Sequence, residues 1–163
     1  MRLDGPYYAK PTEEEISRTC RRIEEWVKDG GFPDPKVRMV LADAVTDRFV
    51  GTVSRYWQSQ ETHWLSVGIV LFDPQHWGKG LGYQGLGMWC GYLLKVMPEL
   101  LRLDLRTWSG NIGMMKLAEK LGFVEEARFR NARIVEGEVY DGMGYGILRE
   151  EWETRYPEGF GKA

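Results

Sequence analysis

The sequence predicts an α/β fold, with a mixed, mostly antiparallel sheet of six or seven strands and helices on both faces. Three strand-like runs follow one another between residues 37 and 72 with short polar turns between them, which favours an antiparallel set. An apolar, helical run at 81–96 then separates two strand-like runs, 64–72 and 101–107, so these two strands should run parallel. A hairpin pattern near the end of the chain completes the sheet.

The first element is an amphipathic helix over about 12–29. Thr12 and Glu15 have the spacing of a capping box, apolar residues recur every three or four positions, and Gly30-Gly31 ends the run. Three strands with a side-chain period of two follow, at 37–44, 49–57 and 64–72. Asp73-Pro74 ends the third strand, because proline cannot donate to the ladder.

The next helix, 81–96, contains four glycines: Gly82, Gly85, Gly87 and Gly91. Each interior glycine costs a helix about 1 kcal/mol relative to alanine, so we expect something to pack or bind closely there. Asn111 can cap a further helix that ends at Gly122. The remaining elements are a hairpin of 123–134 with 139–148, turning at Glu136-Gly137, and a short helical tail at 149–155.

Composition excludes several classes of protein. The 163 residues are 43% hydrophobic with a net charge of −2, which gives no basic footprint for nucleic acid. No apolar run reaches the roughly 18 residues needed to cross a membrane. The two cysteines, Cys20 and Cys90, form neither a disulfide framework nor a metal site. We therefore interpret residues 1–163 as a single cytoplasmic domain with reduced thiols and no metal, and a homodimer remains open.

The stretch between strand and helix, Phe72 to Tyr83, is typical of an anion-binding turn. Its glycines let backbone N–H groups approach a ligand, and the following helix adds a partial positive charge. Gly80, Gly82 and Gly85 also spell G-x-G-x-x-G, with Asp104 about 20 residues further on, as in a dinucleotide-binding oxidoreductase. That fingerprint normally follows the first strand of a parallel sheet, whereas here it follows antiparallel strands.

The same stretch contains Gln75-x-x-Gly78-x-Gly80, and other markers follow in order. They are Asp73-Pro74, Asn111 to Gly122-Phe123, Tyr140-Asp141 and Glu151-Trp152. Over roughly 37–152 this pattern resembles the GNAT superfamily of N-acetyltransferases, and within it the branch of the ribosomal-protein N-terminal acetyltransferases. The resemblance implies a V-shaped splay between the two central parallel strands. It also implies acetyl-CoA as co-substrate and direct acetyl transfer to a primary amine.

The resemblance also implies which positions bind the coenzyme. Backbone N–H groups of the glycine-rich turn would hold the pyrophosphate, the strand edge would pair with the pantetheine and stabilise the oxyanion, and Asn111 would bond near the thiol, unless it is a plain N-cap. The coenzyme-binding positions expected on this basis are Val70, Leu71, Phe72, Gln75, Gly78, Lys79, Gly80, Leu81, Gly82, Tyr83 and Asn111.

Two positions depart from the family pattern. Many members have a tyrosine where this chain has Ala118, and many of this branch have a glutamate where it has Ser66. The proton acceptor is therefore open, because an amine with a pKa of about 10 must lose a proton before it attacks. The candidates are Ser66, Glu61, His63 on the apolar face of its strand, Glu126, Tyr145 or a water chain. The first strand of the family is absent from residues 1–10, or irregular there.

The acceptor is less defined than the coenzyme. Branch resemblance favours the N-terminal amine of a protein or peptide, and a small-molecule amine is the second class. A non-catalytic CoA-binding protein is the remaining alternative, since both usual proton carriers are missing.

Overall fold

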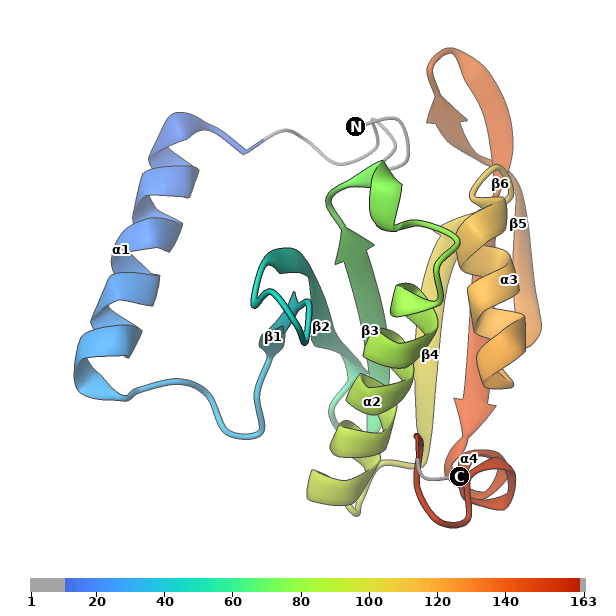
Figure 1. Cartoon of the computed structure of the whole chain (residues 1–163). Helices are drawn as coiled ribbons and strands as arrows, with labels where there is room; N and C mark the ends of the chain where they lie inside the picture. Colours follow the sequence, from blue (N-terminus) through green and yellow to red (C-terminus); the bar gives the residue numbers. More distant parts are fainter. Residues whose placement is uncertain (1–10, 162–163) are drawn as a thin grey trace.

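The computed structural model describes residues 11–161, in which one six-stranded sheet has the order β1-β2-β3-β4-β6-β5 (Figure 1). The strands are β1 Arg38–Ala42, β2 Phe49–Ser59, β3 Trp64–Leu71, β4 Arg102–Trp108, β5 Val124–Val135 and β6 Glu138–Leu148. All neighbours pair antiparallel except β3 and β4, which are parallel. The predicted mixed, mostly antiparallel sheet is therefore confirmed, with six strands.

The helices are α1 Glu13–Asp29, the 3₁₀ turn η1 Pro74–His76, α2 Leu81–Val96, α3 Ile112–Leu121 and α4 Arg149–Arg155. Helices α2 and α3 cover one face of the sheet (Figure 1), and Trp152 of α4 joins the core on that face. Helix α1 stands apart, beyond β1, and none of its residues is buried. The prediction of packed helices on both faces was thus wrong for the described residues, because α1 is ordered by its own caps and not by the sheet.

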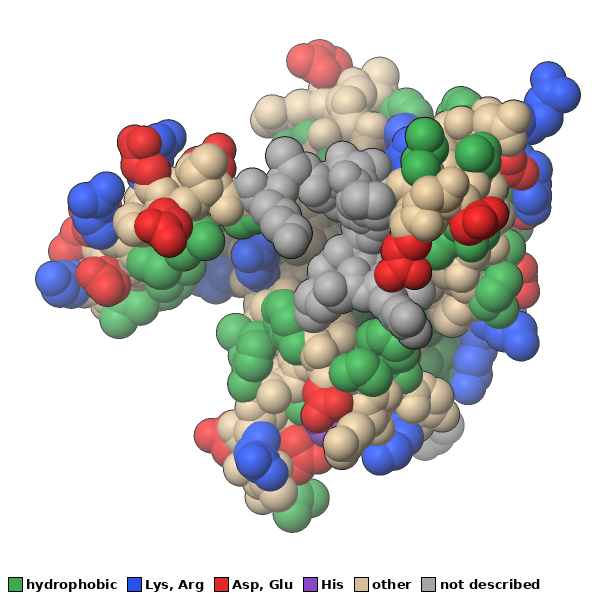
Figure 2. Space-filling model, turned by 90° about the horizontal axis from the view of Figure 1, so that it is seen from above, with side chains coloured by type: hydrophobic (Ala, Val, Ile, Leu, Met, Phe, Trp, Pro, Cys, Tyr) green, Lys and Arg blue, Asp and Glu red, His purple; other side chains and the backbone are tan. Residues whose placement is uncertain are grey.

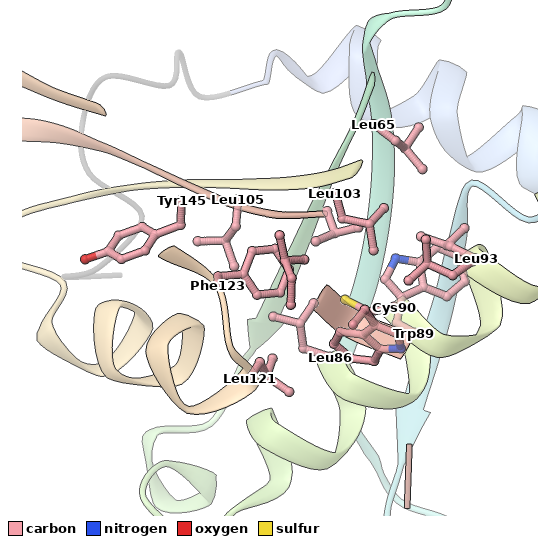
Figure 3. Packing of buried hydrophobic residues seen from close by; sticks show 14 of the residues in the cluster. Leu65, Leu86, Trp89, Cys90, Leu93, Leu103, Leu105, Leu121, Phe123 and Tyr145 are labelled. Carbon is pink, nitrogen blue, oxygen red and sulfur yellow. The ribbon is translucent and has the colours of Figure 1, made fainter. Parts of the chain in front are cut away.

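The core lies between the sheet and α2. Leu65 and Val67 of β3 and Leu103 and Leu105 of β4 alternate with polar neighbours and point to the helix side. There they meet buried α2 side chains, among them Leu86, Cys90 and Leu93 (Figure 3). The same alternation turns Ser66 and Asp104 to the opposite face.

The two central strands separate partway along their length. Parallel pairing joins only Trp64–Ser66 to Arg102–Asp104, although β3 continues to Leu71 and β4 to Trp108. Beyond the Ser66–Asp104 pair, the edge of β3 that faces β4 has no ladder partner among the residues that the structure describes. This is the V-shaped splay that the sequence resemblance implied.

Several helix ends form at the residues that the sequence predicted. Thr12 and Glu15 form both bonds of the capping box, and Gly30 and Gly122 end their helices in the left-handed conformation. One placement was wrong: His63 does not lie on the apolar face of β3, because it occupies the preceding turn with a φ of 52°. The prediction for residues 1–10 lies outside the described part of the chain.

Candidate active site

A cavity of about 780 Å³ opens between the end of β3, the loop that follows it and the start of α3. Of the residues predicted to bind coenzyme, the cavity is lined by Val70, Leu71, Phe72, Gly78, Gly80, Gly82, Tyr83 and Asn111. Gln75, Lys79 and Leu81 belong to the same loop and helix start but are not part of the lining. The structure thus brings most of the predicted coenzyme positions to one hollow.

The loop between β3 and α2 contains backbone N–H groups that have no hydrogen-bond partner in the described part of the chain. Gly78 and Gly80 have φ values of 72° and 84°, which other residues rarely adopt, and no atom lies within 4 Å of where their Cβ would be. Gly80 is the N-cap of α2, and no side chain among residues 11–161 caps that helix. Within this part of the chain the N–H groups of Leu81, Gly82 and Tyr83 therefore have no partner at the positive end of a 16-residue helix.

Local hydrogen bonds hold this loop open. The Oδ1 atom of Asp73 accepts from Gln75 N at 2.8 Å, which starts the turn η1. The indole Nε1 of Trp77 donates to Leu71 O at 3.2 Å, and Phe72 N donates to Val50 O at 3.1 Å. The loop is thus fixed on its β2 side, while its glycines face the cavity.

Two lysines that the sequence reasoning missed also line the cavity. Lys116 and Lys120 are four residues apart, so they lie on one face of α3. The Nζ atom of Lys120 is 4.5 Å from the centre of the Tyr83 ring. Their i,i+4 spacing was the available signal, but only the packing of α3 shows that they face the anion-binding turn.

Asn111 caps α3 and also lines the cavity, so the N-cap role and the predicted coenzyme contact are compatible. Its Oδ1 accepts from Met114 N at 3.2 Å, so it is the N-cap of α3. It also lines the cavity, and its Nδ2 donates no hydrogen bond to any of the residues described. The capping bond fixes the side chain and leaves the amide donor for a ligand.

Tyr156 and Phe160 of the C-terminal segment pack against Tyr83, which lines the cavity. The ring of Phe160 packs 5.1 Å, centre to centre, from that of Tyr83, and Tyr156 Oη lies 3.4 Å from Tyr83 Oη. Phe160 sits over Gly87, where a Cβ would approach its ring to 2.1 Å. Gly85 similarly accommodates Leu41, at 2.9 Å. Close packing therefore explains these two of the four glycines in α2.

The proposed proton acceptors do not line the cavity. Glu61 and His63 lie in or beside the turn before β3, at the opposite end of that strand from the glycine-rich loop. Tyr145 packs on the helix side of the sheet, its hydroxyl directed away from the other labelled residues (Figure 3). That hydroxyl is buried and has no hydrogen-bond partner in the described chain, and burial raises the pKa of Tyr145.

The other two candidates lie on the opposite face of the sheet. Ser66 is fully buried, and its Oγ accepts from Gln58 Nε2 at 3.0 Å. Glu126 of β5 pairs with Arg102 of β4. Arg102 also donates to Asp104 Oδ1, from Nε at 2.9 Å and from Nη2 at 2.7 Å. These side chains form one polar cluster, which we call the fork cluster: Gln58, Ser66, Arg102, Asp104 and Glu126.

The position of Asp104 does not support the dinucleotide-binding alternative. In that fold the acidic residue would end its strand near the glycine-rich turn. Here Asp104 lies inside β4, is bonded to Arg102 and faces away from α2.

No helix between residues 11 and 161 combines the length and apolar character needed to span a bilayer. Nor does that stretch bring together three or more His, Cys, Asp or Glu side chains that could hold a metal ion.

Comparison with known proteins agrees with this geometry. Residues 1–124 match the family model described as Acetyltransferase (GNAT) domain. An uncharacterized N-acetyltransferase from the SPbeta prophage of Bacillus subtilis strain 168, YokL, is 24% identical over 139 residues, which are 85% of this chain and 76% of that protein.

Similar folds occur among solved structures. A mutant form of the spermidine/spermine N-acetyltransferase SpeG from Vibrio cholerae superposes with a TM-score of 0.70 and 21% identity, over 90% of this chain and 83% of that one. A ribosomal-protein-S5-alanine acetyltransferase from Vibrio fischeri superposes with a TM-score of 0.67 and 20% identity, over 89% of this chain and 79% of the other.

Proposed function

We infer that this chain, which belongs to the GNAT acetyltransferase family, moves the acetyl group of acetyl-CoA to a primary amine. The observation that carries the proposal is a single cavity that joins the uncapped start of α2 to the unpaired edge of β3. The first feature suits a pyrophosphate, and the second suits an extended chain that carries amides. Coenzyme A contains both groups, a pyrophosphate and an extended pantetheine chain with amides.

We propose the following contacts for the coenzyme. The backbone N–H groups from Gly78 to Tyr83 hold the pyrophosphate, and Lys116 and Lys120 add positive charge beside it. Edge groups of β3 around Val70 to Phe72 pair with the pantetheine, and one of their N–H groups stabilises the oxyanion. The Nδ2 of Asn111 bonds near the thiol end.

Acetyl transfer proceeds by direct attack of the amine on the thioester. Neither cysteine is placed to form a covalent intermediate: Cys90 is buried in α2, where burial raises the pKa of its thiol, and Cys20 is exposed on α1. The chain therefore has to orient the thioester, stabilise the oxyanion and accept a proton from the amine.

Two classes of acceptor remain. The sequence resemblance favours the N-terminal amine of a protein or peptide, and small-molecule amines are the second class. Of the two solved structures above, one is named as an acetyltransferase of spermidine and spermine, which are small amines, and the other as an acetyltransferase of a ribosomal protein. We also propose that residues 1–163 form one cytoplasmic domain, and that sedimentation will decide whether it dimerises.

Thermal unfolding with acetyl-CoA, followed by a thiol-release screen against N-terminal peptides and small amines, tests the proposal. Acetyl-CoA should raise Tm by an amount set by its concentration over Kd, and at least one amine should give turnover. Stabilisation without turnover across the panel would instead support a non-catalytic CoA-binding protein.

Gly78→Glu should weaken acetyl-CoA binding by about 100-fold or more, because it places a negative charge among the phosphate-binding N–H groups. Gly137→Glu is the matched control: Gly137 also has a positive φ, 86°, and open space around its Cβ position, but lies in the hairpin turn between β5 and β6. Unchanged affinity in Gly78→Glu, or equal loss in both variants, would contradict the proposed coenzyme site.

A further inference from the structure

The last pair that joins β3 to β4 carries two buried polar side chains on the face turned away from α2. Ser66 and Asp104 are register partners, with residue exposures of 0% and 6%. Beyond this pair the two strands separate. A buried carboxylate at the apex of the splay is unusual, because charged groups rarely lose their water without a specific reason.

The Asp104 carboxylate is held by two neighbours. Both hydrogen bonds from Arg102 reach Oδ1, and a hydrogen bond from the Trp64 side chain lowers the pKa of Asp104. Arg102 is shared, since it also pairs with the more exposed Glu126. Burial raises the pKa of Asp104, and the bonds from Arg102 act in the opposite direction. The carboxylate is therefore held in place by Arg102 and Trp64 at the point where the two strands separate.

The backbone of β3 next to Ser66 is not closely covered by the described residues. Gly68 follows Ser66 on the same face, and among residues 11–161 an added Cβ there would meet only Ser54 Oγ, at 3.5 Å. Ile69, the first β3 residue of the cavity lining, is three positions after Ser66, which is roughly 10 Å along a strand. An amine over Gly68 would lie between the carboxylate and the β3 edge proposed for the thioester.

We propose that Asp104 is the catalytic residue that takes the proton from the acceptor amine, directly or through one water. The proposal rests on the proposed function. The ammonium gives one proton to the Asp104 carboxylate, and the freed lone pair attacks the thioester carbonyl carbon. The new C–N bond gives a tetrahedral oxyanion, the C–S bond then breaks as the carbonyl re-forms, the departing coenzyme thiolate takes the second proton from nitrogen, and Asp104 returns its proton to water.

The other carboxylate of the fork cluster fits this role less well. Glu126 has a side-chain exposure of 42% and lies on β5, on the far side of Arg102 from the splay. Glu61 and His63 lie in or beside the turn before β3, and Tyr145 is on the helix side of the sheet. Of these groups, Asp104 alone belongs to the strand pair that opens into the cleft.

Asp104→Asn tests the inference, because it keeps the shape of the side chain and removes the proton acceptor. With an alkylamine acceptor found in the screen, kcat should fall about 100-fold or more, while the Tm shift produced by acetyl-CoA stays as in the unmodified chain. With 2,2,2-trifluoroethylamine, which is mostly unprotonated at neutral pH because its three fluorines lower the ammonium pKa, the loss should be at least tenfold smaller. A structural role alone would lower both activities equally.

Glu125→Gln is the matched control, since Glu125 is another arginine-paired carboxylate, bonded to Arg128 on β5, and its kcat should stay within about threefold. Asp104→Asn with kcat also within threefold, or equal losses for both amines, would overturn the inference. If Asp104→Asn does not fold, Asp104→Ser replaces it, since serine is not a base at neutral pH: a tenfold lower kcat with intact acetyl-CoA stabilisation supports the role, and unchanged kcat overturns it. An unmodified chain without turnover on any amine overturns the proposed function itself, and this inference with it.

Discussion

Helices α1 and α2 are of similar length but are ordered by different means. Helix α2 buries seven of its residues, and its glycines admit Leu41 and Phe160. Helix α1 buries none, and Ile16 and Val27 of its apolar stripe are 49% and 65% exposed. In Figure 2 this arm carries charged side chains on its outer surface and hydrophobic ones along one side. Capping can thus define a helix without attaching it to a core, and the two regions should respond differently to perturbation.

Thiol labelling should show the largest difference between the regions. Cys20 is exposed on α1, whereas Cys90 is fully buried in α2, and burial raises the pKa of its thiol. At neutral pH in native buffer, Cys20 should react with iodoacetamide about 1000-fold faster or more, because Cys90 must await a large opening of the core. Mass spectrometry of each peptide over time gives the two rates. Comparable rates would mean that α2 is not the fixed element described above.

Two glycines of α2 provide a sharper test of close packing. Gly87→Ala places a Cβ 2.1 Å from the Phe160 ring, so the free energy of unfolding should fall by about 1–3 kcal/mol. Gly91→Ala is the control on the same helix: its Cβ would lie 3.7 Å from Phe160, and the better helix propensity should leave stability unchanged or raise it by up to about 1 kcal/mol. Denaturant titration measures the free energy of unfolding of both variants. Equal changes would argue against close packing of Phe160 on Gly87.

Removal of one positive charge from the cavity should have a smaller effect than the changes above, and it should act on acetyl-CoA affinity. Lys120→Gln removes the ammonium beside the Tyr83 ring and the expected phosphates, so acetyl-CoA affinity should fall by about threefold to tenfold. The loss should shrink as salt rises, because screening weakens the same attraction in the unmodified chain. Calorimetry at two ionic strengths checks this, with Lys28→Gln on α1 as the control. A similar loss for both lysines would indicate a general charge effect.

Removal of the α1 cap should have the smallest effect of these changes, and the loss of hydrogen-exchange protection should be confined to α1. Thr12→Ala should lower the hydrogen-exchange protection of α1 amides by about threefold to tenfold and leave α2 unchanged. Hydrogen bonds from the Thr12 backbone and side chain lower the pKa of Glu15. Their stabilisation is therefore present above the ordinary carboxyl pKa and disappears as pH falls through the lowered one. Acidification should reduce α1 protection in the unmodified chain and somewhat less in Thr12→Ala, because alanine keeps the backbone N–H that donates to Glu15 but loses the side-chain hydrogen bond. A loss that spreads to α2 would show that the regions are coupled.

The sequence was sufficient for most of the fold because its signals are local. Thr12 with Glu15, Asp73-Pro74, Asn111 and Glu136-Gly137 each mark an element boundary through backbone chemistry. His63 was misplaced because it continues the alternation of β3, although the chain there has already turned with a positive φ. Alternation alone cannot show where a ladder begins.

The candidate site was less predictable because its parts meet only in three dimensions. The glycine-rich turn is contiguous and could be found from sequence. Lys116 and Lys120, by contrast, acquire their place only when α3 packs beside that turn. The Ser66–Asp104 pair depends on the register of two strands linked by a helix. The partner that Gly87 requires, Phe160, is supplied by a segment far along the chain.

The seat of Phe160 on α2 has a consequence for the order in which a nascent chain can fold. Gly87 leaves the ribosome roughly seventy residues before Phe160, a delay of several seconds at about 5–20 residues per second. During that interval β3 and α2 can form, but the groove over Gly87 stays open to water and to chaperones. The packing behind Tyr83 is complete only when Phe160 has been synthesised, so coenzyme binding should follow the synthesis of this residue.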